Sequence, residues 1–184
     1  MPKNILVITG SARSEGNSMS LAKAFIRGAR KSGNAVRRFD AALKYIYPCR
    51  GCDKCWSKGK PCIVDDAFNQ IAPYLHVSNI IVLATPLYWG NFSSAIKAFV
   101  DKLYAYHVDF RKRDLKITQS ILLAAGESED PQAFAMLKQN YMYIAKELKW
   151  ENIGIITVGG VKDERAVEQL NAVHEAYELG KSIE

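Results

Sequence analysis

Short apolar runs alternate with helical patterns along this chain, and the alternation constrains its fold more than any other feature. The runs span residues 5–8, 35–39, 80–84, 121–125 and 153–158. Between them, apolar residues recur at the three- and four-residue spacing of amphipathic helices. Because continuously apolar strands need cover on both faces, the alternation predicts a parallel sheet between two helical layers. Five such units fit a flavodoxin-like three-layer α/β sandwich with strand order 2-1-3-4-5.

Capping residues place the starts of two helices. Asp65 or Asp66 is expected to be the N-cap of the helix that precedes the third apolar run. Asp130 and Pro131 are expected at the cap and first turn of the helix that follows the fourth run. The apolar faces predict helices over residues 21–29, 68–75, 96–103, 134–148 and 167–177.

The length of 184 residues, 48% of them hydrophobic, predicts one domain over residues 1–184. The connection over about residues 41–64 is expected as a cysteine-rich insertion loop of this flavodoxin-like domain. No apolar run approaches the ~18–20 residues of a membrane span, so no membrane partner is expected. The chain passes from residues 1–4 directly into its first run, which predicts a cytoplasmic protein without a leader peptide.

The formal net charge of +6 comes from basic residues that are mostly scattered among acidic ones. The densest group is Arg111, Lys112 and Arg113, which Asp114 follows, and we expect it to be a solvated face. A nucleic-acid partner needs a basic stripe or a recognisable module, and neither is present. A mildly basic surface instead suits anionic cofactors such as phosphorylated nucleotides.

The first apolar run leads into a loop rich in glycine and hydroxyl groups. Residues 10–18 read GSARSEGNS, which matches neither a Walker loop nor the dinucleotide fingerprint. Free backbone N–H groups at a helix start, with hydroxyl groups beside them, suit a compact phosphate. The alternative is an ordinary turn in which Asn17 or Ser18 caps the helix. The candidate phosphate ligands are Ser11, Arg13, Ser14, Gly16, Asn17 and Ser18.

An aromatic loop follows the third run, where such folds ordinarily have short polar connections. Residues 85–93 read TPLYWGNFS. A flat, largely apolar ligand that stacks on these side chains explains the clustering, and a subunit interface is the alternative. The two explanations are compatible, because a pocket and an interface can share one loop. The candidate ring-binding residues are Pro86, Leu87, Tyr88 and Trp89.

The loop after the fourth run supplies the third wall of the expected pocket. Gly126 permits a ring to approach the backbone closely. Glu127 either accepts a hydrogen bond from the polar edge of a ring or caps the next helix. Ligands of such sheets bind at the carboxyl ends of the strands. A phosphate at one end and an aromatic shelf at the other describe flavin mononucleotide (FMN).

Two motifs together resemble the NADPH-dependent FMN reductase family. The stretch at residues 10–18, with Leu21 and Ala22 after it, looks like the phosphate loop of that family. Residues 84–89, ATPLYW, and 97–101, KAFVD, look like its flavin-ring loop and the following helix. The resemblance extends to residues 176–181, AYELGK, and so covers nearly the whole chain.

The resemblance implies the roles of particular residues. Ser11, Arg13, Asn17 and Ser18 match residues that hold the FMN phosphate, and residues 86–89 match the ring-binding loop. It also implies a homodimer or homotetramer with the flavin near a subunit interface. Hydride would pass from NAD(P)H to the flavin and then to a small acceptor such as a flavin or a quinone. No acid–base side chain is needed, because the cofactor carries the chemistry.

All the cysteines lie in the connection over residues 41–64, in the pattern C-x2-C-x2-C-x6-C. A compact wrap of this kind suits a [4Fe–4S] cluster and is similar to the cysteine motif of iron–sulfur flavoproteins. Reduced thiols or disulfides, and a zinc site, are the alternatives. The candidate metal ligands are Cys49, Cys52, Cys55 and Cys62.

Three functions follow from these patterns. The first is an NAD(P)H-dependent flavin enzyme that reduces a small acceptor. The second is an iron–sulfur flavoprotein that relays electrons between protein partners. The third is a non-catalytic sensor in which the cysteines respond to redox state.

Overall fold

The computed structural model describes residues 1–107, 113 and 115–184. Its centre is a five-stranded parallel sheet in the order β2-β1-β3-β4-β5, which confirms the predicted flavodoxin-like α/β sandwich. Arg111 and Lys112 of the predicted basic face lie outside the described residues. The strands are β1 (Asn4–Thr9), β2 (Ala35–Asp40), β3 (Ile80–Pro86), β4 (Gln119–Ala125) and β5 (Glu151–Val158).

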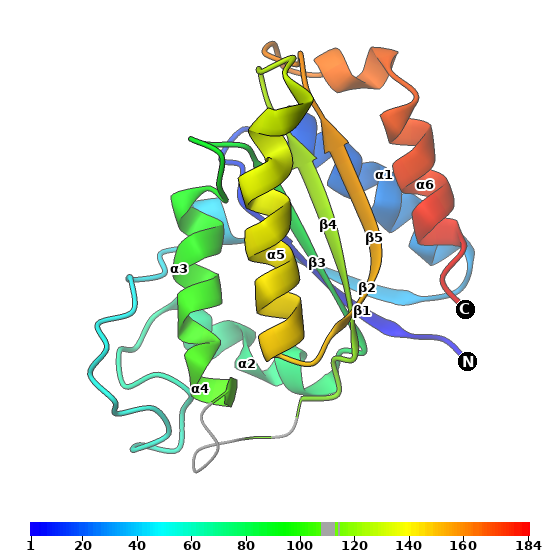
Figure 1. Ribbon diagram of the computed structural model, residues 1–184. Helices are drawn as coiled ribbons and strands as arrows, with labels where there is room; N and C mark the ends of the chain where they lie inside the picture. The colour runs from blue at the N-terminus through cyan, green and yellow to red at the C-terminus, as the bar shows by residue number, and fades with distance from the viewer. Residues whose placement is uncertain (108–112, 114) are drawn as a thin grey trace.

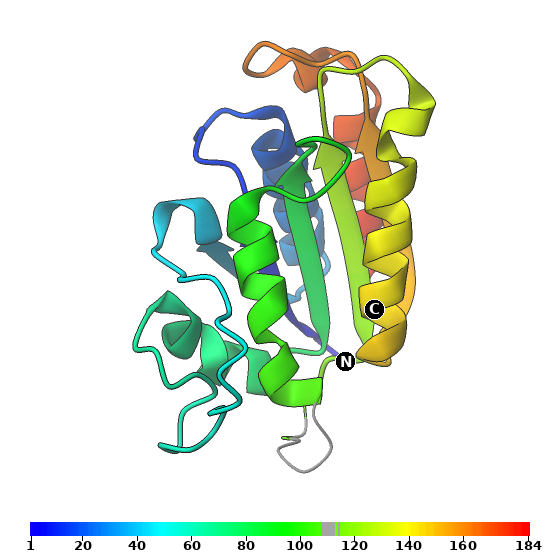
Figure 2. The same cartoon turned by 60° about the vertical axis from the view of Figure 1, so that its left-hand side comes forward.

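Helices cover both faces of the sheet, as Figures 1 and 2 show. On one face lie α1 (Asn17–Lys31) and α6 (Ala172–Lys181). On the other lie α2 (Ala67–Val77), α3 (Ser94–Lys102) and α5 (Ala135–Glu147), and the short α4 (Tyr104–His107) follows α3. In the part of the chain that the structure describes, no helix has the length and apolar character that crossing a bilayer requires.

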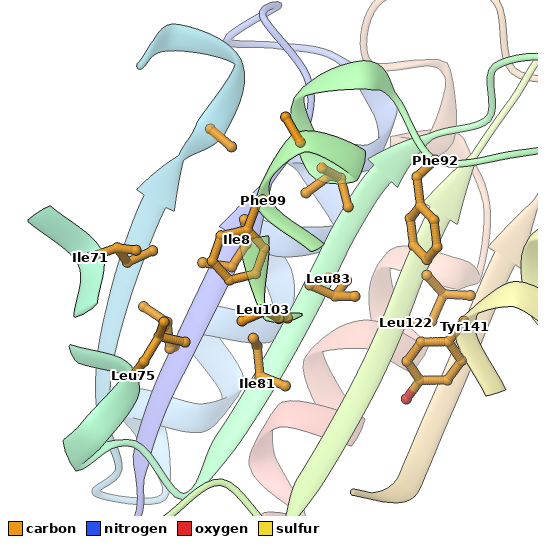
Figure 3. Close-up of a cluster of buried hydrophobic side chains, with 14 of the residues drawn as sticks. Ile8, Ile71, Leu75, Ile81, Leu83, Phe92, Phe99, Leu103, Leu122 and Tyr141 are labelled. Carbon is orange, nitrogen blue, oxygen red and sulfur yellow. The ribbon is translucent and has the colours of Figure 1, made fainter. Parts of the chain in front are cut away.

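Alternate residues of each central strand point into different cores. In β1, Leu6 and Ile8 join the core beneath α2, α3 and α5, whereas Ile5 and Val7 join the core beneath α1 and α6. The first core includes Phe99 and Tyr141, which are labelled in Figure 3. Because both faces are covered, the central strands are apolar throughout, as the sequence pattern predicted.

Burial in this core raises the pKa of the Tyr141 hydroxyl to about 12. The hydrogen bond between this hydroxyl and that of Ser120 lowers the pKa, but by less than burial raises it.

The helix starts and ends differ from the sequence expectations at three places. Asp66 caps α2 by accepting from Phe68 N, as predicted. Helix α1 begins after Gly16 without a side-chain cap, so the alternative in which Asn17 or Ser18 caps an ordinary turn does not hold. Asp130 and Pro131 open a 3-10 turn, η3 (Pro131–Phe134), before α5 begins. The helix predicted over residues 167–177 is divided into η4 (Ala166–Gln169) and α6, because the backbone at Leu170 is extended.

The long connection between β2 and α2 contributes no strand to the described sheet. It begins with a 3-10 turn, η1 (Ala41–Leu43), and then runs as an irregular chain. In Figures 1 and 2 it passes along the outside of the molecule towards the end of α3. The cysteines are therefore carried on a surface loop that lies against α2, α3 and α4.

Candidate functional site

Four connections meet at the carboxyl edge of the sheet (Figure 2). They enclose a pocket of about 270 Å³. They are the loops that follow β1, β3, β4 and β5. The topology predicts a ligand site at this edge, and the first three loops are those that the sequence patterns singled out. The lining residues are Ser11, Arg13, Gly16, Asn17, Ser18, Pro86, Leu87, Tyr88, Ala125, Gly126, Glu127, Val161 and Lys162.

The start of α1 forms the polar end of the pocket. Gly16 occupies the N-cap position without a side-chain cap, so the first-turn N–H groups of the helix point toward the loop. A Cβ atom on Gly16 would lie 2.7 Å from Ser11 Oγ and would fill this cradle. Arg13 adds a guanidinium group at the same end. Backbone N–H groups and a cation in a concave loop are the features that suit a phosphate.

Two of the predicted phosphate ligands use their side chains within the protein. The Ser11 hydroxyl accepts from Arg13 N at 3.1 Å and donates to Arg13 O, which fixes the shape of the loop. The Asn17 amide donates to Val161 O at 3.3 Å and to Asp163 O at 2.9 Å, and its oxygen accepts from Val167 N at 3.0 Å. Asn17 therefore builds the wall of the pocket rather than offering its side chain to a ligand.

The loop between β5 and α6 is a fourth wall that the sequence analysis missed. Besides the Asn17 contacts, Arg165 donates to Glu15 at 2.8 Å, and Arg165 N donates to Glu15 O. These bonds bring Val161 and Lys162 to the pocket. The paired glycines at residues 159–160 were the available signal, since Gly160 has a φ of +70° and marks a turn at the end of a strand.

Glu15 ties the two loops together electrostatically. Its carboxylate accepts from Arg165 and Lys23, and these cations hold the pKa of Glu15 below its ordinary value. The group is exposed, so the interaction is screened by solvent and salt. Lowering the pH through this depressed pKa protonates Glu15 and removes the link, whereas at neutral pH the link is complete.

The loop after β3 forms the apolar side of the pocket. Leu87 N donates to Ala125 O at 2.8 Å, which holds this loop beside Gly126. A Cβ on Gly126 would lie 2.9 Å from the Leu87 side chain, so only glycine fits there without a shift. Tyr88 lines the pocket and is 57% exposed, and it therefore presents a free ring edge or face to a ligand.

Ten of the predicted cofactor residues line the pocket, whereas Ser14 does not. Trp89 also lies outside the pocket lining. It is at the tip of a tight turn in which Tyr88 and Asn91 exchange backbone hydrogen bonds, and both Trp89 and Gly90 have positive φ. The Trp89 residue is fully exposed. An exposed tryptophan of this kind fits the interface alternative for the aromatic loop better than the ring-stacking one.

Glu127 pairs with Lys162 across the mouth of the pocket, with Oε1 and Nζ 3.0 Å apart. The carboxylate raises the pKa of Lys162 above its ordinary value, so the ammonium is fully charged at neutral pH. Both side chains are exposed and free to change partners. The pair can open and leave Lys162 and Arg13 as two cations beside an anionic ligand.

A second, smaller cavity of about 30 Å³ lies beneath the insertion loop. Its walls include all four predicted metal ligands, Cys49, Cys52, Cys55 and Cys62. Lys102 at the end of α3 and Tyr104 at the start of α4 also line it. None of the four cysteines is in a disulfide. Among the described residues, no three Cys, His, Asp or Glu side chains are close enough to hold an ion as they stand.

A buried ion pair anchors the start of this loop. The Asp66 carboxylate accepts from the Lys102 ammonium, from Tyr47 N at 2.9 Å and from Phe68 N at 3.0 Å. The side chains of Asp66 and Lys102 are each 2% exposed. One carboxylate therefore joins the insertion loop, α2 and α3 at a single point.

The two cavities lie near opposite ends of α3. Ser93, the N-cap of α3, packs against Gly10 in the loop that leads to the first pocket. Lys102, the last residue of α3, lines the cysteine cavity. Four thiols around one largely apolar cavity fit a thiolate-ligated metal centre once the outer stretch of the loop, the exposed residues 49–52, closes on the cavity.

The chain is similar to several known flavoproteins. The family model for NADPH-dependent FMN reductase matches residues 3–174. An iron-sulfur flavoprotein of Methanocaldococcus jannaschii is 26% identical over 140 residues, which cover 76% of this chain and 72% of that protein. An iron-sulfur flavoprotein of Archaeoglobus fulgidus is 30% identical over 99 residues, which cover 54% of this chain and 44% of that protein.

The fold recurs in solved structures. An NAD(P)H:quinone oxidoreductase from Methanothermobacter marburgensis superposes with a TM-score of 0.79. The match covers 98% of this chain and 96% of that one at 12% sequence identity, so it establishes the shared fold alone. The family model, which spans nearly all of the chain, confirms the resemblance that the two loop motifs indicated, together with the flavin and nicotinamide cofactors typical of the family. The chain belongs to the NADPH-dependent FMN reductase family.

Proposed function

We propose that this protein is an FMN-dependent NAD(P)H oxidoreductase that passes electrons to a small acceptor such as a flavin or a quinone. The observation that carries the proposal is the pocket at the carboxyl edge of the sheet. Its polar end combines the uncapped start of α1 with Arg13, and its other end combines Leu87, Tyr88 and Gly126. A phosphate at one end and a flat ring at the other are what FMN offers.

Each part of the pocket has a separate task in this proposal. The first-turn N–H groups of α1 and Ser18 bind the phosphate, and Arg13 neutralises its charge. Leu87, Tyr88 and Gly126 hold the ring in place and exclude water from one side of it. Bound FMN supplies the hydride chemistry, so the chain has to orient the two reactants rather than provide an acid or a base.

The first experiment is an anaerobic titration of the FMN-loaded protein with NADPH and with NADH. We expect bleaching of the flavin absorbance, and its return when a quinone is added. Arg13→Ala should weaken FMN binding by about 10- to 100-fold, since one charge-assisted hydrogen bond contributes about 1.5–3 kcal/mol. Arg27→Ala removes an exposed guanidinium of α1 outside the pocket lining and is the matched control.

Two results would contradict this proposal. Equal FMN affinity in the wild type and in Arg13→Ala would remove Arg13 from the phosphate site. Tight FMN binding without bleaching by either nicotinamide would favour the non-catalytic sensor instead.

The resemblance further suggests a homodimer or homotetramer, for which the exposed Trp89 is a candidate contact.

The cysteine cavity favours a second candidate function, which is electron relay through FMN and a [4Fe–4S] cluster to a redox partner protein. The four thiols line one cavity, and two related proteins are named iron-sulfur flavoproteins. A bound cluster would exchange single electrons, and Cys49, Cys52, Cys55 and Cys62 would be its ligands.

The second candidate predicts about four iron and four sulfide per chain in anaerobically purified protein, as a [4Fe–4S] cluster requires. Cys52→Ser is expected to remove most of this iron and the broad visible absorbance beneath the flavin bands. Ser57→Ala, on the same loop, is the control and should keep both. Protein that holds no iron in the wild type would exclude the cluster while leaving the flavin proposal intact.

A further inference from the structure

Asn69 lies in the first turn of α2, and its side-chain amide bonds to the backbone of Cys62, the fourth cysteine, and of Val64. Its oxygen accepts from Cys62 N at 3.0 Å. Its nitrogen donates to Cys62 O at 3.0 Å and to Val64 O at 2.9 Å. Both donors and the acceptor of this amide are therefore engaged with residues 62–64.

The helix itself does not require these bonds. Asp66 already caps α2, and asparagine is a weaker helix former than alanine or leucine. The side chain holds both the N–H and the C=O of one residue, which fixes the orientation of the peptide units on either side of Cys62. The direction of the Cys62 Cα–Cβ bond, and with it the region that the thiol can reach, follows from that orientation.

The cysteines of the loop differ in how firmly the structure holds them. Cys62 and Cys55 are half-buried and pack against the core, and Trp56, beside Cys55, donates from its indole to Ala105 O at 2.8 Å. Cys49 and Cys52 are exposed on the outer stretch. The cavity therefore has an inner side that is attached to the domain and an outer side that faces solvent.

We propose that Asn69 is a positioning residue for a thiolate-ligated metal centre, and that the centre assembles on Cys62 as its fixed ligand. This inference rests on the proposal that the four cysteines hold such a centre. Asn69 acts through the backbone of Cys62, in the manner of outer-shell partners that orient metal ligands. Cys49 and Cys52 then close from the exposed side and complete the site.

Cobalt is a suitable probe, because Co²⁺ bound by thiolates absorbs through sulfur-to-metal charge transfer, and the intensity grows with the number of thiolates. The experiment titrates reduced, FMN-loaded protein with Co²⁺ alone under anaerobic conditions. Asn69→Ala should weaken Co²⁺ binding by about 10- to 100-fold, as is typical for loss of an outer-shell partner. Its charge-transfer intensity should fall to that of Cys62→Ser, and the double variant should show no further loss.

Gln70→Ala is the matched control, since it removes an exposed amide from the next position of the same helix. It should bind Co²⁺ as the wild type does. Far-UV circular dichroism and FMN affinity are measured on every variant, and both should be unchanged by Asn69→Ala. Asn69→Asp keeps the acceptor for Cys62 N but turns a carboxylate toward two carbonyl oxygens, so it should lose Co²⁺ at least as strongly.

Three outcomes separate the inference from the proposal on which it rests. Loss of Co²⁺ in Asn69→Ala together with the spectrum of Cys62→Ser supports the positioning role. Wild-type binding and a four-thiolate spectrum in both folded Asn69 variants overturn that role while the cysteine site stands. A wild type that takes up neither Co²⁺ nor iron overturns the cysteine site itself, and the positioning role with it.

Discussion

Asn17→Ala is expected to weaken FMN binding by about 10- to 100-fold. The side chain makes three hydrogen bonds to the loop between β5 and α6, at Val161, Asp163 and Val167. At a net value of about 1 kcal/mol for each bond, their loss removes up to about 3 kcal/mol from the organisation of that wall. Isothermal titration of the apoprotein with FMN measures the effect.

The control for this variant is Asn171→Ala, which removes an asparagine that pairs with Glu175 on the exposed surface of α6. It should leave the FMN affinity unchanged. A direct role of Asn17 as a phosphate ligand would give a different pattern. In that case riboflavin, which lacks the phosphate, would bind equally well to the wild type and to Asn17→Ala, whereas a disordered wall weakens both flavins.

Lys102→Met is expected to lower the free energy of unfolding by about 3–5 kcal/mol, because it leaves the buried Asp66 carboxylate without its cation. Few single substitutions in this chain should destabilise the fold as much, since most lower the free energy of unfolding by about 0.5–3 kcal/mol. Urea denaturation followed by circular dichroism gives the value. The insertion loop should also become more sensitive to protease near Tyr47, which depends on the same carboxylate.

Lys97→Met is the natural comparison, because Lys97 pairs with Asp101 on the exposed face of the same helix. That substitution should change stability by less than about 0.5 kcal/mol. The double variant Asp66→Asn with Lys102→Met should be more stable than Lys102→Met alone, because it removes the unpaired charge. Equal destabilisation by Lys97→Met and Lys102→Met would mean that the buried ion pair contributes no more to stability than the exposed one.

Local sequence patterns were sufficient to predict the sheet and three of the pocket loops. Continuous apolar runs such as residues 80–84 show directly that both faces of a strand are buried. The alternation of strands and helices then leaves few topologies, and the observed order is among the common ones. The loops follow, because the carboxyl ends of parallel strands meet at one edge.

The features that the patterns missed depend on contacts between distant residues. Asn17 and Val167 are separated by 150 positions, so no local signal announces the wall that they build. The aromatic pattern around Trp89 does not reveal that this residue has a positive φ and lies at the tip of a turn. The burial of Lys102 could not be predicted from the sequence either, because a lysine is ordinarily exposed. Its burial depends on the ion pair with Asp66.

The insertion loop has a consequence for how chemistry can be added to this scaffold. The strands pair with one another without any residue between Asp40 and Ala67, and the loop is attached through a few side chains of α2 and α3. A different segment could therefore be grafted between those attachment points with the strand order and the flavin pocket unchanged. The domain is modular in this sense: one connection, and the cysteines that it carries, can be exchanged while the strands and the pocket at their carboxyl edge stay the same.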